Sequence, residues 1–216
     1  MNNRFFFTAL FLLIIYSTFL GQGIAMKEKN ENMIFDSDLT FDEAVAGTDF
    51  PQEIRANLTL VKIKHLGFDG KIHVGELVVN KLIANDVKAI FMKLLSVKFP
   101  IEKVIPIVKY SWDDEKSMQD NNTSAFNYRV IKGTTRLSKH SYGLAIDINP
   151  KLNPYVKKNS VEPKGSVYNP RIPGTIVKDS QVVKIFKSYG WKWGGDWTRG
   201  KDYQHFEFNR EDKIEK

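Results

Sequence analysis

The 216-residue sequence contains no cysteine. This absence excludes a disulfide framework, a thiolate metal site, a cysteine nucleophile and a lipid-modified cysteine anchor. Any metal ion must therefore be held by nitrogen and oxygen ligands. Histidine is also scarce, with four residues in the chain. Apolar residues make up 42% of the sequence and aromatic residues 12%, which argues against wholesale disorder.

The charges of the chain are unequal in number. Lys and Arg contribute 32 residues and Asp and Glu 25, so the formal net charge is +7. A basic protein is attracted to anionic polymers, and cell-wall material with its carboxylates and phosphates is one candidate, although solubility alone explains such a charge equally well. The lysines are scattered and no nucleic-acid-binding motif occurs, so we predict no nucleic-acid partner.

The longest apolar run lies at the N-terminus. Arg4 is followed by the apolar residues 5–20, and the small residues Gly23 and Ala25 stand where a signal peptidase prefers them. We predict a signal peptide over 1–25, a polar leader over 26–50 and one folded domain over 51–216, exported to the periplasm or the exterior. An uncleaved membrane anchor is the alternative, because the run approaches the length that spans a bilayer.

The pattern after residue 51 predicts an α+β domain with a central antiparallel sheet and flanking helices. Residues 58–66 and 72–79 indicate a hairpin with a turn at Asp69-Gly70, and apolar residues recur at helical spacing over 83–95. Further expectations are strands over 101–110, 144–149 and 205–208, a surface loop over 112–123, an irregular insert over 149–179, and a short helix between Asp179 or Ser180 and Gly190.

Two motifs concentrate groups that bind metal ions: Ser138-Lys139-His140-Ser141-Tyr142-Gly143-Leu144-Ala145-Ile146-Asp147 and Asp202-Tyr203-Gln204-His205-Phe206-Glu207. Side chains alternate along a strand, so Asp147 and His205 point away from their apolar neighbours and lie side by side if the two strands pair. His140 can fold back over the strand end across a turn at Gly143. Two imidazoles and a carboxylate are a common ligand set of catalytic zinc. We therefore predict a metal site on the sheet.

The pattern Ser138-x-His140-x-x-Gly143-x-Ala145-x-Asp147, with Asp202-x-x-His205 later, resembles the zinc D-alanyl-D-alanine peptidases of the VanX and VanY type. It is most similar to the branch that includes L-alanyl-D-glutamate endopeptidases. The resemblance covers roughly residues 75–208, with supporting stretches at 126–129 and 190–197.

The resemblance implies a fold like that of the hedgehog domains and the D-Ala-D-Ala peptidases, with one Zn²⁺ ion as the cofactor. The implied zinc ligands are His140, Asp147 and His205, and Asp202 takes the position of the general base. Arg129 matches the residue that stabilises the oxyanion or holds the substrate carbonyl, with Arg136 as an alternative that lacks the motif context. Ser138 would hydrogen-bond the peptide.

One departure from the pattern bears on specificity. The D,D-dipeptidases carry glutamate where this chain has Asp202, whose side chain is one methylene shorter. This favours the endopeptidase-like or broader carboxypeptidase branches. We therefore expect a cell-wall-associated zinc peptidase that hydrolyses peptidoglycan stem peptides. The rival is a non-catalytic zinc module that binds wall fragments or a protein, since hedgehog signalling domains share a related zinc site.

Three other features permit more than one interpretation. His65 and His73 flank the predicted hairpin turn, where surface histidines are a simpler interpretation than a second metal site. Glu207 shares the face of His205 and is a candidate partner for that ring. The tryptophans within 191–197 either line a substrate groove or pack in the core.

Overall fold

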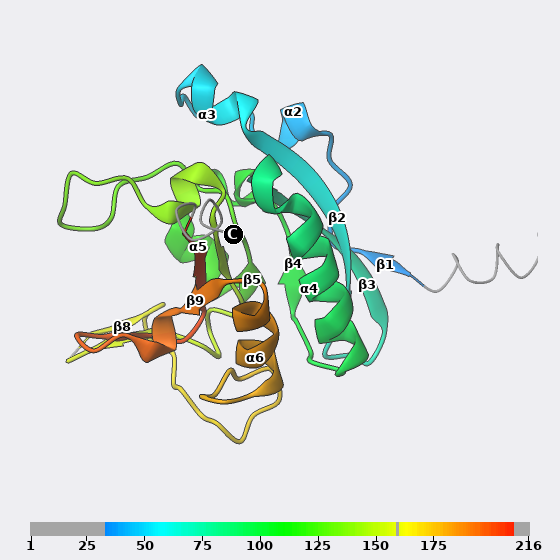
Figure 1. Cartoon of the computed structure of the whole chain (residues 1–216), viewed down its shortest axis with the longest axis vertical. Helices are drawn as coiled ribbons and strands as arrows, with labels where there is room; N and C mark the ends of the chain where they lie inside the picture. The colour runs from blue at the N-terminus through cyan, green and yellow to red at the C-terminus, as the bar shows by residue number, and fades with distance from the viewer. Residues whose placement is uncertain (1–32, 159, 210–216) are drawn as a thin grey trace, which may run out of the picture. The chain divides into compact units, whose positions relative to one another are not determined.

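The computed structural model describes residues 33–158 and 160–209. The chain divides into two compact units, 1–34 and 35–216, and the second contains nearly all of the described residues. The predicted signal peptide and the first part of the predicted leader lie outside the described residues. Within the part that is described, no helix has the length and apolar character needed to cross a membrane. The second unit mixes helices and strands (Figure 1).

The longest strands form the predicted hairpin. β2 (Leu58–Leu66) and β3 (Ile72–Asn80) pair antiparallel along their whole length, from Leu58 opposite Asn80 to Leu66 opposite Ile72. The turn falls at the predicted Asp69-Gly70. The register also sets His65 opposite His73, and His65 is 1% exposed. The interpretation of His65 as a surface residue is therefore wrong, because the segment before β2 covers it.

Helix α4 (Ala84–Ser96) is the predicted helix after the hairpin. A short 3₁₀ turn, η1 (Lys81–Ile83), precedes it, and the side chain of Asn80 accepts a hydrogen bond from the Leu82 N–H at that start. The apolar residues recur at helical spacing, so one stripe faces inward: Val87, Ile90, Phe91 and Leu94. Figure 1 shows α4 lying along the hairpin.

The segment 101–123 differs from the prediction. The expected strand over 101–110 is wrong for most of its length: it is reduced to β4 (Lys103–Val104), and η2 (Ile107–Tyr110) follows Pro106, which has no N–H for a strand ladder. The expected surface loop over 112–123 contains α5 (Asp114–Gln119) and β5 (Asn122–Thr123), which pairs parallel with β4. The carboxylate of Asp113 accepts a hydrogen bond from the Lys116 N–H and so caps α5.

The remaining strands form two small sheets. One has the order β6 (Ala145–Asp147), β11 (His205–Phe208), β9 (Trp191–Trp193), and the other β10 (Lys201–Asp202), β7 (Tyr155–Lys157), β8 (Ser160–Glu162); all four pairings are antiparallel. The predicted insert over 149–179 therefore contains a hairpin. The other elements are β1 (Ile34–Phe35), α2 (Phe41–Ala44), α3 (Gln52–Ala56), η3 (Lys139–Tyr142), α6 (Gln181–Ser188) and η4 (Gly194–Asp196). The predicted single central sheet is not confirmed, since the strands are divided among separate sheets.

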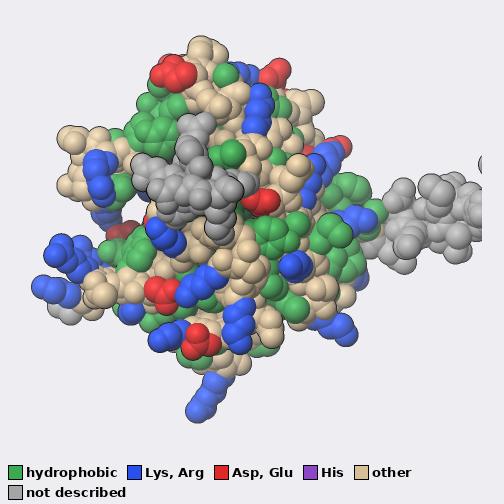
Figure 2. Space-filling view, viewed as in Figure 1, with side chains coloured by type: hydrophobic (Ala, Val, Ile, Leu, Met, Phe, Trp, Pro, Cys, Tyr) green, Lys and Arg blue, Asp and Glu red, His purple; other side chains and the backbone are tan. Residues whose placement is uncertain are grey.

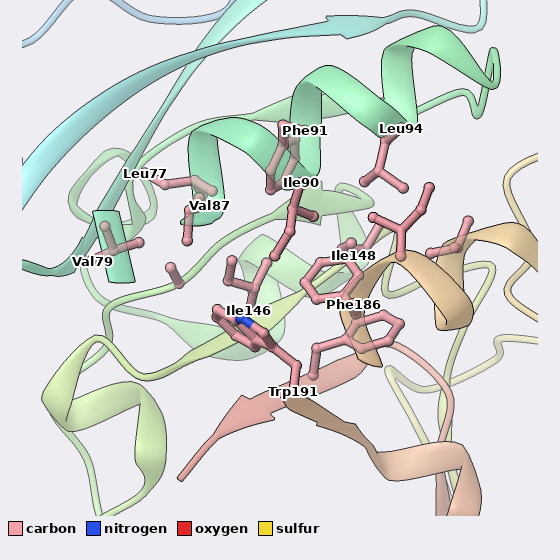
Figure 3. Packing of buried hydrophobic residues seen from close by; sticks show 14 of the residues in the cluster. Leu77, Val79, Val87, Ile90, Phe91, Leu94, Ile146, Ile148, Phe186 and Trp191 are labelled. Atoms are coloured by element: carbon pink, nitrogen blue, oxygen red, sulfur yellow. The ribbon is translucent and has the colours of Figure 1, made fainter. Parts of the chain in front are cut away.

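The main apolar core lies between the hairpin, α4, α6 and the β6–β11–β9 sheet. Figure 3 shows side chains from these elements meeting, among them Leu77, Ile90, Ile146, Phe186 and Trp191. Trp191 and Trp193 are both 2% exposed, so these two tryptophans pack in the core, as one of the two interpretations had it. This core fixes one face of β6 and β11 and leaves their other face to polar side chains.

Candidate metal centre

The pairing of β6 with β11 sets Asp147 directly opposite His205. On the core side, Ile146 and Phe206 are fully buried among apolar side chains. Because side chains alternate along each strand, Asp147 and His205 share the opposite face. The predicted juxtaposition of these two residues is therefore present in the structure, and it follows from the apolar alternation of the two strands.

His140 reaches the same place from η3. The Oγ of Ser138 accepts a hydrogen bond from the His140 N–H at 3.3 Å and begins this turn, and Gly143 ends it with a φ of 63°. A Cβ on Gly143 would lie 2.7 Å from the backbone nitrogen of Asn80, so the chain can pass β3 here only as glycine. The sharp turn returns the chain into β6 with His140 above the strand.

The three side chains meet closely. His140 Nε2 lies 3.2 Å from Asp147 Oδ2, His205 Nδ1 lies 2.9 Å from Asp147 Oδ1, and the two ring nitrogens are 3.2 Å apart. The exposed fractions of His140, Asp147 and His205 are 3%, 6% and 7%. One nitrogen of each imidazole and the carboxylate therefore surround a common, buried point.

The far nitrogen of each ring has its own partner. His140 Nδ1 lies 2.6 Å from the carbonyl oxygen of Ala125, to which it donates, and His205 Nε2 lies 3.4 Å from Glu207 Oε2. These contacts orient the rings and leave Nε2 of a neutral His140 as a lone pair that faces the common point. Glu207 is thus the partner of His205, as its place on the strand face indicated.

Burial and close contact shift several pKa values at this point. Burial raises the pKa of Asp147, but His140 and His205 lower it more, and the net direction is downward. Burial lowers the pKa of His205, while contacts with Asp147 and Glu207 raise it to about 10. Burial raises the pKa of Asp202 to about 7, and the nearby His205 opposes this shift. The surroundings of Asp147 and His205 therefore favour a positive charge, from a proton or a cation, between these side chains.

The donor set fits a divalent cation of the zinc type. Two imidazole nitrogens and one carboxylate suit zinc, and metal–nitrogen bonds of about 2.1 Å in a tetrahedron give an edge of roughly 3.4 Å between ligand atoms. The ring nitrogens are 3.2 Å apart, close to that edge. Oδ1 of Asp202 is buried without a hydrogen-bond partner among the described residues. A bound cation would give the two ring nitrogens a common partner, and a water molecule on that cation would give Asp202 Oδ1 a hydrogen-bond donor.

A cavity of about 630 Å³ opens beside the cluster. It is lined by the six residues to which the resemblance assigns the main roles: Arg129, Ser138, His140, Asp147, Asp202 and His205. Asp202 enters from β10, whose pairing sets it opposite Tyr155 on β7. Ser138 Oγ is already engaged as the cap of η3, so its contact with a peptide stays a prediction. Arg136 is exposed and does not line the cavity, which favours its interpretation as a surface charge.

Sequence reasoning missed Asp114, which holds Arg129 in the cavity wall. Asp114 Oδ2 lies 2.9 Å from Arg129 Nη2, and its Oδ1 accepts a hydrogen bond from Asn127 Nδ2 at 3.1 Å. The Arg129 N–H donates to Ser141 Oγ at 2.9 Å. The signal that could have located Asp114 is the Asp113 cap, which places Asp114 in the first turn of a helix.

The other walls come from the insert and from the loop after Arg129. The β7–β8 hairpin contributes Lys157 and Glu162, and the loop contributes Lys132, whose Nζ lies 2.6 Å from Glu162 Oε1. Trp197 also lines the cavity, so the groove interpretation holds for this tryptophan. The cavity therefore combines a buried metal-type cluster with charged and aromatic walls.

Comparison with known proteins agrees with the motifs. Residues 132–208 match the model of a protein family described as D-alanyl-D-alanine carboxypeptidase. Over 73 residues the chain is 38% identical to the peptidoglycan L-alanyl-D-glutamate endopeptidase CwlK of Bacillus subtilis (strain 168). The aligned segment covers 32% of this chain and 38% of that protein. The chain thus spans well under half the length of this relative. No solved structure matches the chain significantly. The resemblance seen in the sequence is confirmed: over 132–208 the chain matches the D-alanyl-D-alanine carboxypeptidase family.

Proposed function

We propose that the protein is a zinc-dependent peptidase that hydrolyses the stem peptides of peptidoglycan, of the D-alanyl-D-alanine carboxypeptidase or L-alanyl-D-glutamate endopeptidase type. One observation carries the proposal: His140, Asp147, His205 and Asp202 converge in one cavity, within a segment that matches the carboxypeptidase family. The hedgehog-like fold implied by the resemblance is part of the same proposal.

The proposed ligands are His140 through Nε2, His205 through Nδ1 and the carboxylate of Asp147. When bound, zinc polarises the scissile carbonyl and lowers the pKa of water to near neutrality. The protein holds these ligands rigidly, because His205 and Asp147 are paired across two strands and His140 is anchored by the Ala125 carbonyl. Ligands held in this way would keep a bound ion at the wall of the cavity.

Asp202 is the proposed general base. Its side chain lines the cavity, and its Oδ1 is buried without a hydrogen-bond partner in the described part of the chain. In this role it accepts a proton from the attacking water and later gives that proton to the leaving amine. Gln204, which lies between Asp202 and His205 in the sequence, also lines the cavity.

Arg129 is proposed to neutralise the charge that develops on the substrate carbonyl oxygen. Its guanidinium stays cationic at all working pH values, and Asp114 fixes its direction at 2.9 Å. The loss of one such donor typically costs about a hundredfold to a thousandfold in rate. Ser138 is the proposed hydrogen-bond partner of the bound peptide.

The walls of the cavity carry charges of both signs. Lys132, Lys139 and Lys157 line it together with carboxylates such as Glu162 and Glu207, which suits a peptide substrate with charged groups. On the face that Figure 2 shows, Lys and Arg side chains are spread out and not gathered into a stripe. This supports an anionic wall polymer over nucleic acid as the partner. Export to the periplasm or the cell exterior, with membrane attachment only through an uncleaved N-terminal segment, belongs to the proposal.

A reaction with defined muropeptides tests the proposed function. The full chain is incubated with zinc, with and without a chelator, and the products are identified by mass spectrometry. Free D-alanine would indicate the carboxypeptidase type, and a new D-glutamate amino terminus the endopeptidase type. Chelation should stop either reaction. Zinc binding without any product would contradict the proposal and favour the rival, a zinc module that binds wall fragments or a protein without cleaving them.

A further inference from the structure

All four histidines of the chain lie in clusters with an aspartate. The first pair, His140 and His205, borders the 630 Å³ cavity. The second pair is His65 on β2 and His73 on β3, which are directly opposite each other in the hairpin. Opposite residues in an antiparallel pair project from the same face, and the ring centroids are 5.3 Å apart. The hairpin thus presents two imidazoles side by side.

Asp36 lies between these two rings. Its Oδ2 is 2.7 Å from His65 Nε2, and its Oδ1 is 2.9 Å from His73 Nδ1. The Asp36 N–H donates to the Val74 carbonyl, and Asp36 Oδ2 accepts from the Val104 N–H at 2.7 Å. The exposed fractions of the His65, Asp36 and His73 side chains are 1%, 5% and 13%. The cluster is therefore buried, with access to solvent at His73.

With a neutral His73, this cluster is one proton short of pairing both of its carboxylates. A neutral ring has one N–H, so it can donate to Asp69 Oδ1, 3.1 Å from Nε2, or to Asp36 Oδ1, 2.9 Å from Nδ1, but not to both. The other nitrogen then directs its lone pair at a carboxylate oxygen, and the two repel each other unless a proton or a metal ion lies between them. His65 Nδ1 is buried and has no hydrogen-bond partner among the described residues.

The turn beside the cluster holds the His73 ring in place. A Cβ on Gly67 would lie 2.5 Å from His73 Nε2, so the backbone packs against this ring as closely as glycine permits. Asp69 holds the same nitrogen from the turn. His73 is thus oriented on its far side, as the imidazoles of the first cluster are.

We infer that Asp36, His65 and His73 form a second binding site for a divalent cation of the zinc type. The ligand atoms are His65 Nε2, His73 Nδ1 and an Asp36 oxygen, which lie within 4.8 Å of one another. Two imidazoles and a carboxylate select a borderline transition-metal ion over Mg²⁺ or Ca²⁺, which prefer oxygen ligands alone. The ion would join the segment at Asp36 to the hairpin and to β4.

The site is structural rather than catalytic. None of its ligands lines the 630 Å³ cavity. Asp36 lies 29 and 37 residues from His65 and His73 in the sequence, so a bound ion stabilises the folded arrangement over the unfolded chain. The alternative that needs no metal is a protonated His73 that donates to both carboxylates.

Metal stoichiometry separates these alternatives. The full-length chain and its Asp36→Asn variant are stripped with a chelator, dialysed against Zn²⁺ at neutral pH and analysed by mass spectrometry for bound zinc. The introduced amide keeps the shape of the side chain but not the charge. The inference predicts that the variant binds about one zinc equivalent less than the parent. Equal zinc content in the two proteins overturns it and supports the protonated His73.

A variant that lacks the first cluster makes this test independent of the proposed peptidase function. In a His140→Ala/His205→Ala chain, where the first cluster is removed, about one equivalent should remain. A further His73→Ala substitution should abolish it, whereas Lys64→Ala, at an exposed position on the same hairpin, should not. Retention of zinc after His73→Ala would overturn the inference. Circular dichroism confirms that each variant is folded, and peptide hydrolysis plays no part in the readout.

Discussion

The two histidine clusters have the same ligand types and different surroundings. His140, Asp147 and His205 border a cavity that also holds a buried carboxylate and a guanidinium. His65, His73 and Asp36 are enclosed by a hairpin turn and the segment before it, and none of them lines that cavity. The ligand set alone therefore does not define a catalytic site. The neighbouring carboxylate, the guanidinium and the cavity beside them are what distinguish the first cluster from the second.

The clusters also differ in how their ligands are fixed. In the first, the far nitrogens contact a carbonyl oxygen and Glu207. In the second, His73 contacts Asp69, while His65 Nδ1 has no partner in the described chain. If each cluster holds an ion, removal of the first should affect catalysis most, and removal of the second should affect stability most.

The largest expected effect is that of His205→Ala. This variant loses a proposed zinc ligand, and hydrolysis of muropeptides should fall by at least about a thousandfold, because the chemistry that the ion supplies is lost. The matched variant in the other cluster, His73→Ala, should retain near-parental turnover. The measurement is initial rate at saturating substrate for both variants. Normal turnover in His205→Ala would refute the assignment of this ligand.

Asp202→Asn should separate ion binding from turnover. The amide has nearly the same shape as the carboxylate but cannot accept the proton, so kcat should fall by about a hundredfold to ten-thousandfold while zinc content stays at the parental value. Rate and metal content are measured on the same preparation. A variant that keeps its turnover would show that Asp202 is not the base.

A smaller effect is expected for Asp114→Asn. Loss of the charge that holds Arg129 should misplace the guanidinium and lower kcat by roughly tenfold to a hundredfold, with unchanged zinc content. Arg136→Ala removes an exposed charge outside the cavity and serves as the control, with an expected rate close to that of the parent. If the two variants behave alike, Asp114 does not position Arg129 for catalysis.

The smallest effect on the reaction is expected at the second cluster. Asp36→Asn should leave hydrolysis unchanged yet lower the free energy of unfolding by about 1–3 kcal/mol, since the charged Asp36 contacts both rings and accepts a hydrogen bond from the Val104 N–H. The increase in Tm that zinc produces should also be smaller than in the parent. Thermal unfolding with and without zinc checks both. If Asp36→Asn abolished hydrolysis and left the thermal unfolding unchanged, the roles assigned to the two clusters would have to be exchanged.

Local patterns and the family resemblance together made the first cluster predictable, although its residues meet across 58 and 65 residues of sequence. Apolar alternation in 144–148 and 205–208 fixes which face each ligand occupies, and the turn at Gly143 accounts for the return of His140. Asp36 could not be found in this way. It meets His65, His73 and Val104 across 29, 37 and 68 residues of sequence, and no local period reports such contacts.

Short elements account for the remaining differences between the predicted and the observed secondary structure. Helix α5 has six residues, too few for a helical period to stand out from a polar stretch, and Asp114 was therefore not assigned to a helix. In 101–110 the apolar composition favoured a strand, but Pro106 interrupts the ladder and a 3₁₀ turn follows it. The single central sheet was expected from strand candidates alone, whose pairing partners the sequence does not specify.

Anomalous diffraction at the zinc edge, from crystals grown with zinc, tests the central claim most directly. The account predicts a peak within bonding distance of His140 Nε2, His205 Nδ1 and the Asp147 carboxylate, on the side that faces the cavity. Crystals that contain zinc but show no peak at these three side chains would contradict it.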